Sequence, residues 1–421
     1  MVTAAAAATP ATSEPLYRLS IADAIAMAQR DNQDMRLARL AVAAAGAGID
    51  SAAAAPNPTL TLGVFGINPS AGVGSGSLRS KTVDSSARID QLFERGGKRS
   101  LRVENATLLT EASQHDAAWM SLQLAVAVRQ ACVDRLAAQE RVDILAQSAR
   151  LADATLAAGR QRQHAGDLAG ADVARLQVDA LRTHNDADQA AADAAHAQLA
   201  LALLLGHGDR PDAILLEGDW HVTAPPGAVD IELIVARRTD VRAAQARARA
   251  AAASSRLALA ARTRDISVGL QYDHFPGSAS NTQGGGNSFG VAIQIPLFVR
   301  NQFDGEIRTA ALAAASADET VLKTRNAGRN EVLRLLADQR NAYERLQRYQ
   351  EQVLPAARRS ADAAEFAFGR GAIAIMDVLD VRRTYRQTQL EALAVRAEYA
   401  RVAASVLQLT ETLIAPIGTA P

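Results

Sequence analysis

A short stretch typical of a β-strand occurs twice in this chain, as LTLGV at residues 60–64 and as ISVGL at residues 266–270. Other pairs repeat at nearly the same distance: DMR at 34–36 returns as DVR at 240–242, and Gly166 returns as Gly371. The distance falls from 206 to 205 residues along the way, so the two halves stay almost in register. Such self-similarity indicates a duplicated unit whose copies supply equivalent walls to one structure.

Each copy alternates helices with one pair of strands. We expect a flexible segment at 1–16 and a first repeat over 17–210, beginning with a helix that Ser20 caps together with Asp23. The first repeat is predicted to contain strands at about 59–66 and 82–93, a long helix at about 98–158 that stops before Gly159, and a helix at about 171–205.

The second copy is expected to follow the same plan after a connector at 211–229. Its predicted elements are a helix over 231–261, strands at about 265–272 and 288–297, a long helix at about 303–368 with a kink at Pro355, and a helix at about 376–413. The second repeat spans 230–415, and a tail at 416–421 follows it.

The strands and helices together set the fold class. The chain is predicted to be mainly α with a small β part, built from duplicated long-helix hairpins. Two strands per copy cannot form a stable sheet alone, so they must pair with strands from elsewhere. A helix over 98–158 would be about 90 Å long at 1.5 Å per residue, which is too long for a compact domain.

Composition excludes several classes of function. The formal net charge is zero, which argues against a nucleic-acid partner. The single cysteine, Cys132, excludes an internal disulfide and lies at helical spacing with Val128 and Leu136, as a small core residue would. The sequence contains no apolar run of about 18 residues and no clear export signal. Barrel strands remain compatible with a membrane location, because they need only about 9–11 residues.

Aromatic residues gather at the predicted strands, which favours a membrane location over simple strand preference. Six of the eight phenylalanines lie in or beside them: Phe65, Phe93, Phe275, Phe289, Phe298 and Phe303. The helices, rich in Ala and Arg, would also suit a soluble coiled-coil scaffold, but such a scaffold does not explain the strands.

From residue 19 to 413 the chain resembles the TolC family of outer-membrane efflux proteins. The resemblance rests on SIADAIAMAQRDNQDMRLARL (20–40), IPLFVRNQ (295–302) and FGRGAIAIMDVLDVRRT (368–384). The element LFERGGKR (92–99) is most similar to the heavy-metal, CzcC-like branch.

The resemblance implies a homotrimer in which each protomer gives four strands to one 12-stranded transmembrane β-barrel, with the helices forming an α-barrel in the periplasm. It further implies a tripartite efflux pump with a periplasmic adaptor protein and an inner-membrane RND transporter. Outer-membrane lipid would surround the barrel. The duct would be passive, and heavy-metal cations are the expected cargo. Drugs or secreted polypeptides remain the alternative.

Asp377 and Asp380 are the candidate pore gate. They are three residues apart on one helix face, and a trimer would turn them into rings of carboxylates that favour cations. Asp377 could instead serve the N-terminal helix dipole, a reading that suits Asp380 less well. Asp172 is the counterpart of Asp377 in the first copy. In some relatives this position is locked by Tyr and Arg, but here the aligned residues are Phe368 and Ile373, which cannot make those bonds.

The two hairpin tips are the candidate docking sites for the adaptor. The predicted residues are Gly166, Asp167, Leu168, Arg370, Gly371 and Ala372. Their glycines would equally suit a turn that docks nothing.

No cofactor, resident metal or enzymatic activity is expected. The seven histidines are scattered, with no pair at ligand spacing, and neither a nucleotide-binding loop nor a hydrolase motif occurs. The energy for transport must therefore come from a partner protein.

Overall fold

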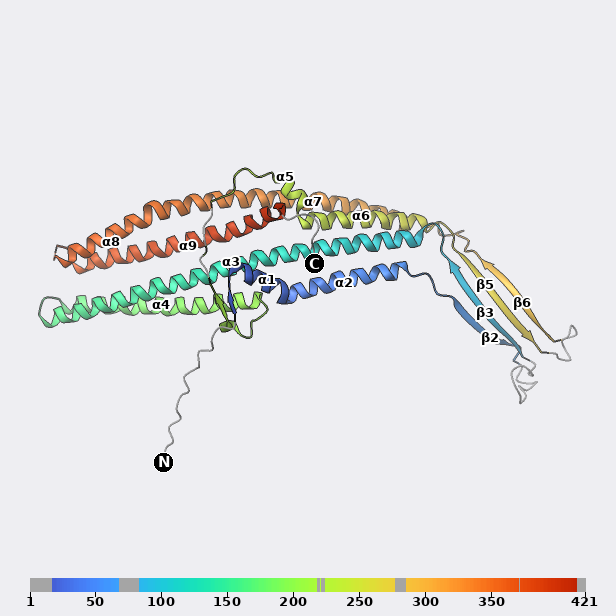
Figure 1. Ribbon diagram of the computed structural model, residues 1–421, viewed down its shortest axis with the longest axis horizontal. Helices are drawn as coiled ribbons and strands as arrows, with labels where there is room; N and C mark the ends of the chain where they lie inside the picture. Colours follow the sequence, from blue (N-terminus) through green and yellow to red (C-terminus); the bar gives the residue numbers. More distant parts are fainter. Residues whose placement is uncertain are drawn as a thin grey trace, which may run out of the picture. The chain divides into compact units, whose positions relative to one another are not determined.

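The computed structural model describes residues 17–67, 83–217, 220, 224–276, 285–370 and 372–414. The predicted terminal segments 1–16 and 416–421 lie outside these ranges. The chain is mainly helical with a small β part, as predicted (Figure 1). Within the described ranges it divides into two compact units, one from 17–40, 116–241 and 325–414 and the other from 41–115 and 242–324. Each unit therefore draws on both sequence copies.

The same order of elements occurs twice. The first series is α1 (Ile21–Asp31), α2 (Gln33–Ala53), β2 (Thr59–Phe65), β3 (Asp84–Phe93), α3 (Lys98–His164) and α4 (Gly170–Leu204). The second is α5 (Ile231–Arg237), α6 (Thr239–Ala260), β5 (Ile266–Phe275), β6 (Gly286–Gln294), α7 (Asp304–Arg348), the π-helical turn η4 (Tyr349–Val353), α8 (Leu354–Gly369) and α9 (Ile375–Ile414). None of these helices is both long and apolar enough to cross a membrane, among the residues described.

The start of the first unit follows the sequence closely. Ser20 caps α1 as predicted: its hydroxyl accepts from the Asp23 N–H at 3.2 Å, and the Asp23 carboxylate accepts from the Ser20 N–H at 3.1 Å. Cys132 is fully buried among apolar side chains, and burial raises the pKa of its thiol to about 12. Its predicted role as a core residue is confirmed.

Two short strands were not predicted. β1 (Tyr17–Leu19) pairs in parallel with β4 (Ile214–Leu216), and the short 3-10 turn η3 (Pro211–Ala213) precedes β4. The pairing fastens residues before α1 to the connector between the sequence copies, and Leu19 and Ile214 are buried in the same core cluster. Strands of three residues are too short to show a period of two in the sequence.

The long helix of the first copy was predicted to stop before Gly159, and this prediction is wrong. α3 continues to His164, and Gly159 lies inside it. A Cβ atom at Gly159 would lie 2.4 Å from Leu176 Cδ1 on α4. This glycine therefore provides room for a close approach between two helices, and the turn itself uses Gly166.

The predicted single helix over 231–261 is wrong, because the chain bends at Arg238 between α5 and α6. Arg238 is extended (φ −58°, ψ 133°) and its side chain is only 4% exposed. Its guanidinium donates to Asp240 at 2.8 and 3.0 Å and to Glu331 at 2.8 Å, and it stacks on the ring of Trp119. Two carboxylates and one aromatic ring thus surround the side chain at the bend.

The predicted kink at Pro355 takes the form of a π-helical turn just before it. Because Pro355 has no N–H, the regular i to i−4 bond cannot form at that residue. The Leu354 N–H instead donates to Tyr349 O, five residues back. The helix of the second copy is thus divided into α7, η4 and α8, whereas α3 is regular throughout.

All four longer strands belong to one antiparallel sheet, in the order β2–β3–β5–β6 (Figure 1). The β3–β5 pair, from Ser85 opposite His274 to Phe93 opposite Ile266, joins the two sequence copies. Within the described residues, β2 and β6 each lack a second neighbouring strand.

The sheet has one apolar and one polar face. The register aligns Leu60, Ile89, Leu270 and Val291 in one row across the strands, and Leu62, Ala87, Tyr272 and Phe289 in another. Several of these side chains are very exposed, with Phe289 at 83% and Leu62 at 72%. The opposite face carries polar pairs, among them Arg88 with Asp90 at 2.8 Å and Gln271 with Asp273 at 2.9 Å. An exposed apolar area of this kind marks contact with lipid or with another protein surface.

An ion pair fastens the sheet to the helices of the second unit. Lys98, the first residue of α3, donates to both carboxylate oxygens of Asp265 at 2.8 Å and to Thr263 O at 2.8 Å. Both side chains are largely buried. Burial alone would raise the pKa of Asp265, but the hydrogen bonds from Lys98 and from the Arg95 N–H outweigh it, so that this pKa is lowered.

We expect Lys98→Met to destabilise the second unit by about 2–3 kcal/mol, between the values for exposed and buried pairs. The loss should be full at neutral pH. Because a lowered pKa stabilises only while the carboxylate is charged, the loss should fade as the pH falls below about 4. Thermal unfolding followed by circular dichroism measures it. Lys323→Met on the exposed surface of α7 is the control and should stay within about 0.5 kcal/mol; an equal effect of both variants would contradict the prediction.

Candidate functional site

The predicted site residues lie at the ends of two helical hairpins of the first unit, α3–α4 and α8–α9 (Figure 1). In the first hairpin, Gly166 has φ +86°, a conformation that suits glycine, and the Asp167 N–H donates to Arg162 O at 2.9 Å. Gly166 and Asp167 are exposed. Leu168 is half-buried against a cluster that contains Leu176, so packing already accounts for it.

The second hairpin closes in a similar manner. The Ala372 N–H donates to Ala367 O at 2.9 Å, across the same number of residues as the bond from Asp167 to Arg162. Arg370 is exposed and stacks over the ring of Phe366, which is itself 68% exposed. Gly371 lies outside the described residues.

The two candidate gate carboxylates differ in what they contact. Asp377 accepts from the Ala374 N–H at 3.3 Å and so satisfies a backbone donor just before α9. Asp380 is exposed, and its carboxylate has no hydrogen-bond or ion-pair partner among the residues described. The alternative role at the helix start therefore applies to Asp377, whereas no local contact accounts for Asp380.

Asp172 is unlike its counterpart in the second copy. Its carboxylate lies 3.5 Å from Arg175, three residues later on the same helix. The corresponding position in the second copy holds Asp380, 205 residues after Arg175. Asp172 is thus partly neutralised, whereas no described partner offsets the charge of Asp380 on α9.

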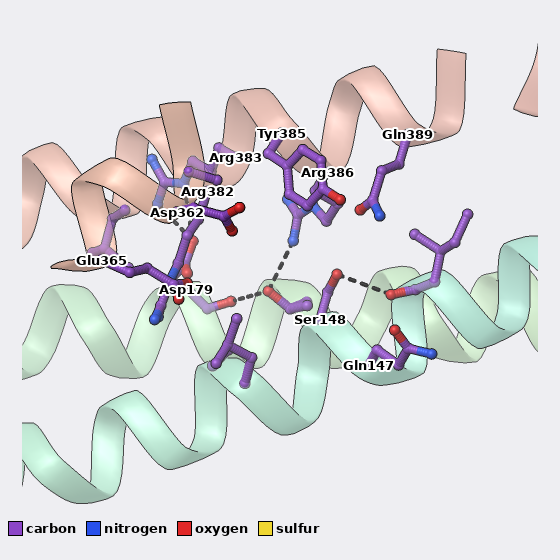
Figure 2. Close-up of a pocket in the computed structure, with 16 residues that line it drawn as sticks. Gln147, Ser148, Asp179, Asp362, Glu365, Arg382, Arg383, Tyr385, Arg386 and Gln389 are labelled. Carbon is purple, nitrogen blue, oxygen red and sulfur yellow. Dashed lines mark hydrogen bonds and ion pairs between the residues drawn. The ribbon is translucent and has the colours of Figure 1, made fainter. Parts of the chain in front are cut away.

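Three arginines of α9, which the sequence analysis did not single out, hold this helix against its neighbours (Figure 2). Arg382 donates to Thr155 Oγ1 of α3 at 2.8 Å and to Glu365 of α8 at 2.9 Å. Arg383 donates to Asp179 of α4 at 2.7 and 3.0 Å. These contacts connect the second hairpin to both helices of the first.

The third arginine extends the same set of contacts. Arg386 donates to Thr183 Oγ1 of α4 at 3.1 Å. Together the arginines border a cavity of about 260 Å³ between the hairpins, and Leu379 joins the apolar cluster of Leu156 and Leu176. At about 100° per residue, Leu379, Arg382 and Arg386 share one face of α9, away from Asp377 and Asp380. A helical projection of 377–386, with two acids followed by three arginines, could have revealed this division.

Phe368 and Ile373, expected to be unable to form a polar lock, make other contacts. Arg162 of α3 lies over the ring of Phe368 at 5.7 Å, a cation–π contact between the hairpins. Ile373 is half-buried. Within the described ranges, no group of three or more His, Cys, Asp or Glu side chains is arranged to hold a metal ion.

Comparison with known proteins gives several independent matches. The family described as "Outer membrane efflux protein" matches residues 24–207 and again residues 231–411. The chain is 26% identical over 333 residues to the cobalt-zinc-cadmium resistance protein CzcC of Cupriavidus metallidurans, across 78% of this chain and 77% of that protein. It is also 26% identical over 336 residues to the pyoverdine export outer membrane protein OpmQ of Pseudomonas putida, across 77% of this chain and 67% of that protein.

Solved structures share the fold at lower identity. A membrane protein from Pseudomonas aeruginosa aligns with a TM-score of 0.78 at 19% identity, over 97% of this chain and 99% of that one. CusC, whose structures were described in terms of transmembrane channel formation, aligns with a TM-score of 0.76 at 20% identity, over 94% and 93% of the two chains.

These matches confirm the predicted resemblance to efflux proteins of the CzcC-like branch. They identify export, and not enzymatic catalysis, as the activity of its relatives. Because the family match covers most of the chain, the protein belongs to the outer membrane efflux protein family.

Proposed function

We propose that three copies of this chain assemble into a passive exit duct in the outer membrane. The observation that carries the proposal is the four-stranded sheet, which exposes an apolar face and, among the residues described, leaves one open edge on β2 and one on β6. Open edges present unpaired N–H and C=O groups, which hydrocarbon cannot satisfy. Three such sheets joined edge to edge would form a closed barrel of twelve strands.

In this barrel the two faces of the sheet would meet different surroundings. The face with Leu62, Leu270 and Phe289 would contact lipid, and the face with Arg88 and Asp273 would line water. This division matches the alternation that outer-membrane barrels require. A soluble coiled-coil scaffold, the alternative of another class, would leave this apolar face without a partner.

The helical part would then lie in the periplasm. The exposed tip residues Gly166, Asp167, Arg370 and Ala372 are proposed to contact a periplasmic adaptor protein, which connects the duct to an inner-membrane RND transporter. Gly371 is part of this proposal by its place in the sequence. Leu168 is the weakest member of the set, because it is already packed against the hairpin.

Asp377 and Asp380 are proposed as the gate of the duct. Both carboxylates are exposed, and Asp380 has no described partner that would cancel its charge. Threefold repetition would give two stacked rings of carboxylates, an arrangement that favours cations over anions. Asp172 would contribute less, because Arg175 offsets its charge.

Metal cations are the proposed cargo. The similarity to the cobalt-zinc-cadmium resistance protein CzcC supports this choice, and so does the negative charge of the gate. The similarity to the pyoverdine exporter OpmQ favours a second candidate, the export of organic compounds.

Replacing both gate carboxylates, Asp377→Asn with Asp380→Asn, should lower the preference of the channel for K⁺ over Cl⁻. The purified protein should also migrate as a trimer on unheated gels, and light scattering in detergent should give the mass of a trimer. Reversal potentials in planar bilayers under a KCl gradient measure the preference. Asp318→Asn, which removes an exposed acid of α7, is the control. An unchanged preference in the double variant would exclude these residues as the gate, whereas a soluble monomer would contradict the duct itself.

Deleting the gene should lower the tolerance of the cell to zinc, cobalt or cadmium more than its tolerance to drugs. Growth over a range of metal and drug concentrations measures both. Restoring the intact gene is the control. Unchanged metal tolerance together with lost drug tolerance would favour the organic cargo.

A further inference from the structure

Arg383 occupies the position from which a cation could neutralise the proposed gate. It lies three residues after Asp380, and residues at this spacing are neighbours on a helix surface. An ion pair between them would cancel the charge of the one gate carboxylate that has no described partner. The argument that follows depends on the gate role proposed above.

In the first copy of the repeat, an aspartate and an arginine at this spacing form an ion pair. Arg175 lies three residues after Asp172 on α4, and its Nη1 atom is 3.5 Å from the Asp172 carboxylate. The acid and the base there pair within their own helix. The same chain thus contains both arrangements, one in each hairpin.

In the second copy, another carboxylate holds the arginine. Arg383 Nε and Nη2 both donate to Asp179 Oδ1 on α4, at 3.0 and 2.7 Å (Figure 2). The Asp179 side chain is only 13% exposed, which shields this ion pair from solvent on one side. The contact directs the guanidinium of Arg383 toward α4, and among the residues described Arg383 forms no ion pair with Asp380.

We propose that Asp179 sets the selectivity of the duct by holding Arg383 away from the gate carboxylate Asp380. Asp179 is then a specificity-determining residue that does not itself have to face the pore. Losing its charge would release Arg383, which would pair with Asp380 as Arg175 pairs with Asp172. The gate would lose negative charge although Asp377 and Asp380 remained unchanged.

The test measures K⁺ over Cl⁻ permeability of the full-length channel in planar bilayers. Asp179→Asn should lower the permeability ratio by the same factor as Asp380→Asn. Arg383→Gln alone should keep the ratio of the parent, because it removes the cation that could neutralise Asp380. The double variant Asp179→Asn with Arg383→Gln should restore the parent ratio, which a loosened contact between helices would not do.

Thr183→Val is the matched control. It removes the hydrogen bond from Arg386 to Thr183 and leaves the ion pair of Arg386 with Asp186, also on α4. Arg386 lies six residues from Asp380, out of reach of its carboxylate. This variant should leave the ratio unchanged. Trimer formation on unheated gels checks each variant, and Asp179→Ser replaces Asp179→Asn if the latter does not assemble.

Two results would overturn the inference without contradicting the proposed duct. One is a K⁺ over Cl⁻ permeability ratio in Asp179→Asn equal to that of the parent protein. The other is a lowered ratio in Asp179→Asn that the double variant does not restore. A parent protein that forms no conducting channel would refute the proposed function, and the inference with it.

Discussion

The backbone pairing between β3 and β5 is the contact on which the remaining architecture depends. In the described part of the chain, each sequence copy provides two of the longer strands, too few for a stable sheet, and this ladder joins both pairs into one sheet of four. It also fixes which side chains share a face, because directly opposed residues of an antiparallel pair point the same way. The exposed apolar rows, and with them the proposed membrane contact, follow from this register.

On α9, one short segment separates two tasks. Leu379, Arg382 and Arg386 attach the helix to three others, whereas Asp377 and Asp380 remain exposed. Arg383 lies between the two groups on the helix surface, and it pairs with Asp179 on α4. Charge at the proposed gate is therefore a property of two hairpins together and not of one helix.

Much of the fold could be predicted from local pattern. The capping pair Ser20 and Asp23 and the core position of Cys132 were predicted from spacing alone, because they depend on neighbours one or two turns away. The bend at Arg238 and the continuation of α3 through Gly159 were missed, since both result from contacts with distant segments. For the same reason the sequence singled out Asp377 and Asp380 as candidates but gave no indication that Arg383 binds Asp179.

The π-helical turn has a geometric consequence for the duplication. α3 and the series α7–η4–α8 are of nearly equal length in residues, yet a π turn accommodates one residue without advancing the regular helical winding. Counted from the first residue of each helix, the winding beyond Val353 in the second copy therefore lags behind that of α3. The duplication is therefore not exact along these helices: the first copy has a regular helix where the second has a π-helical turn, and a partner protein that contacts both would meet two different backbones.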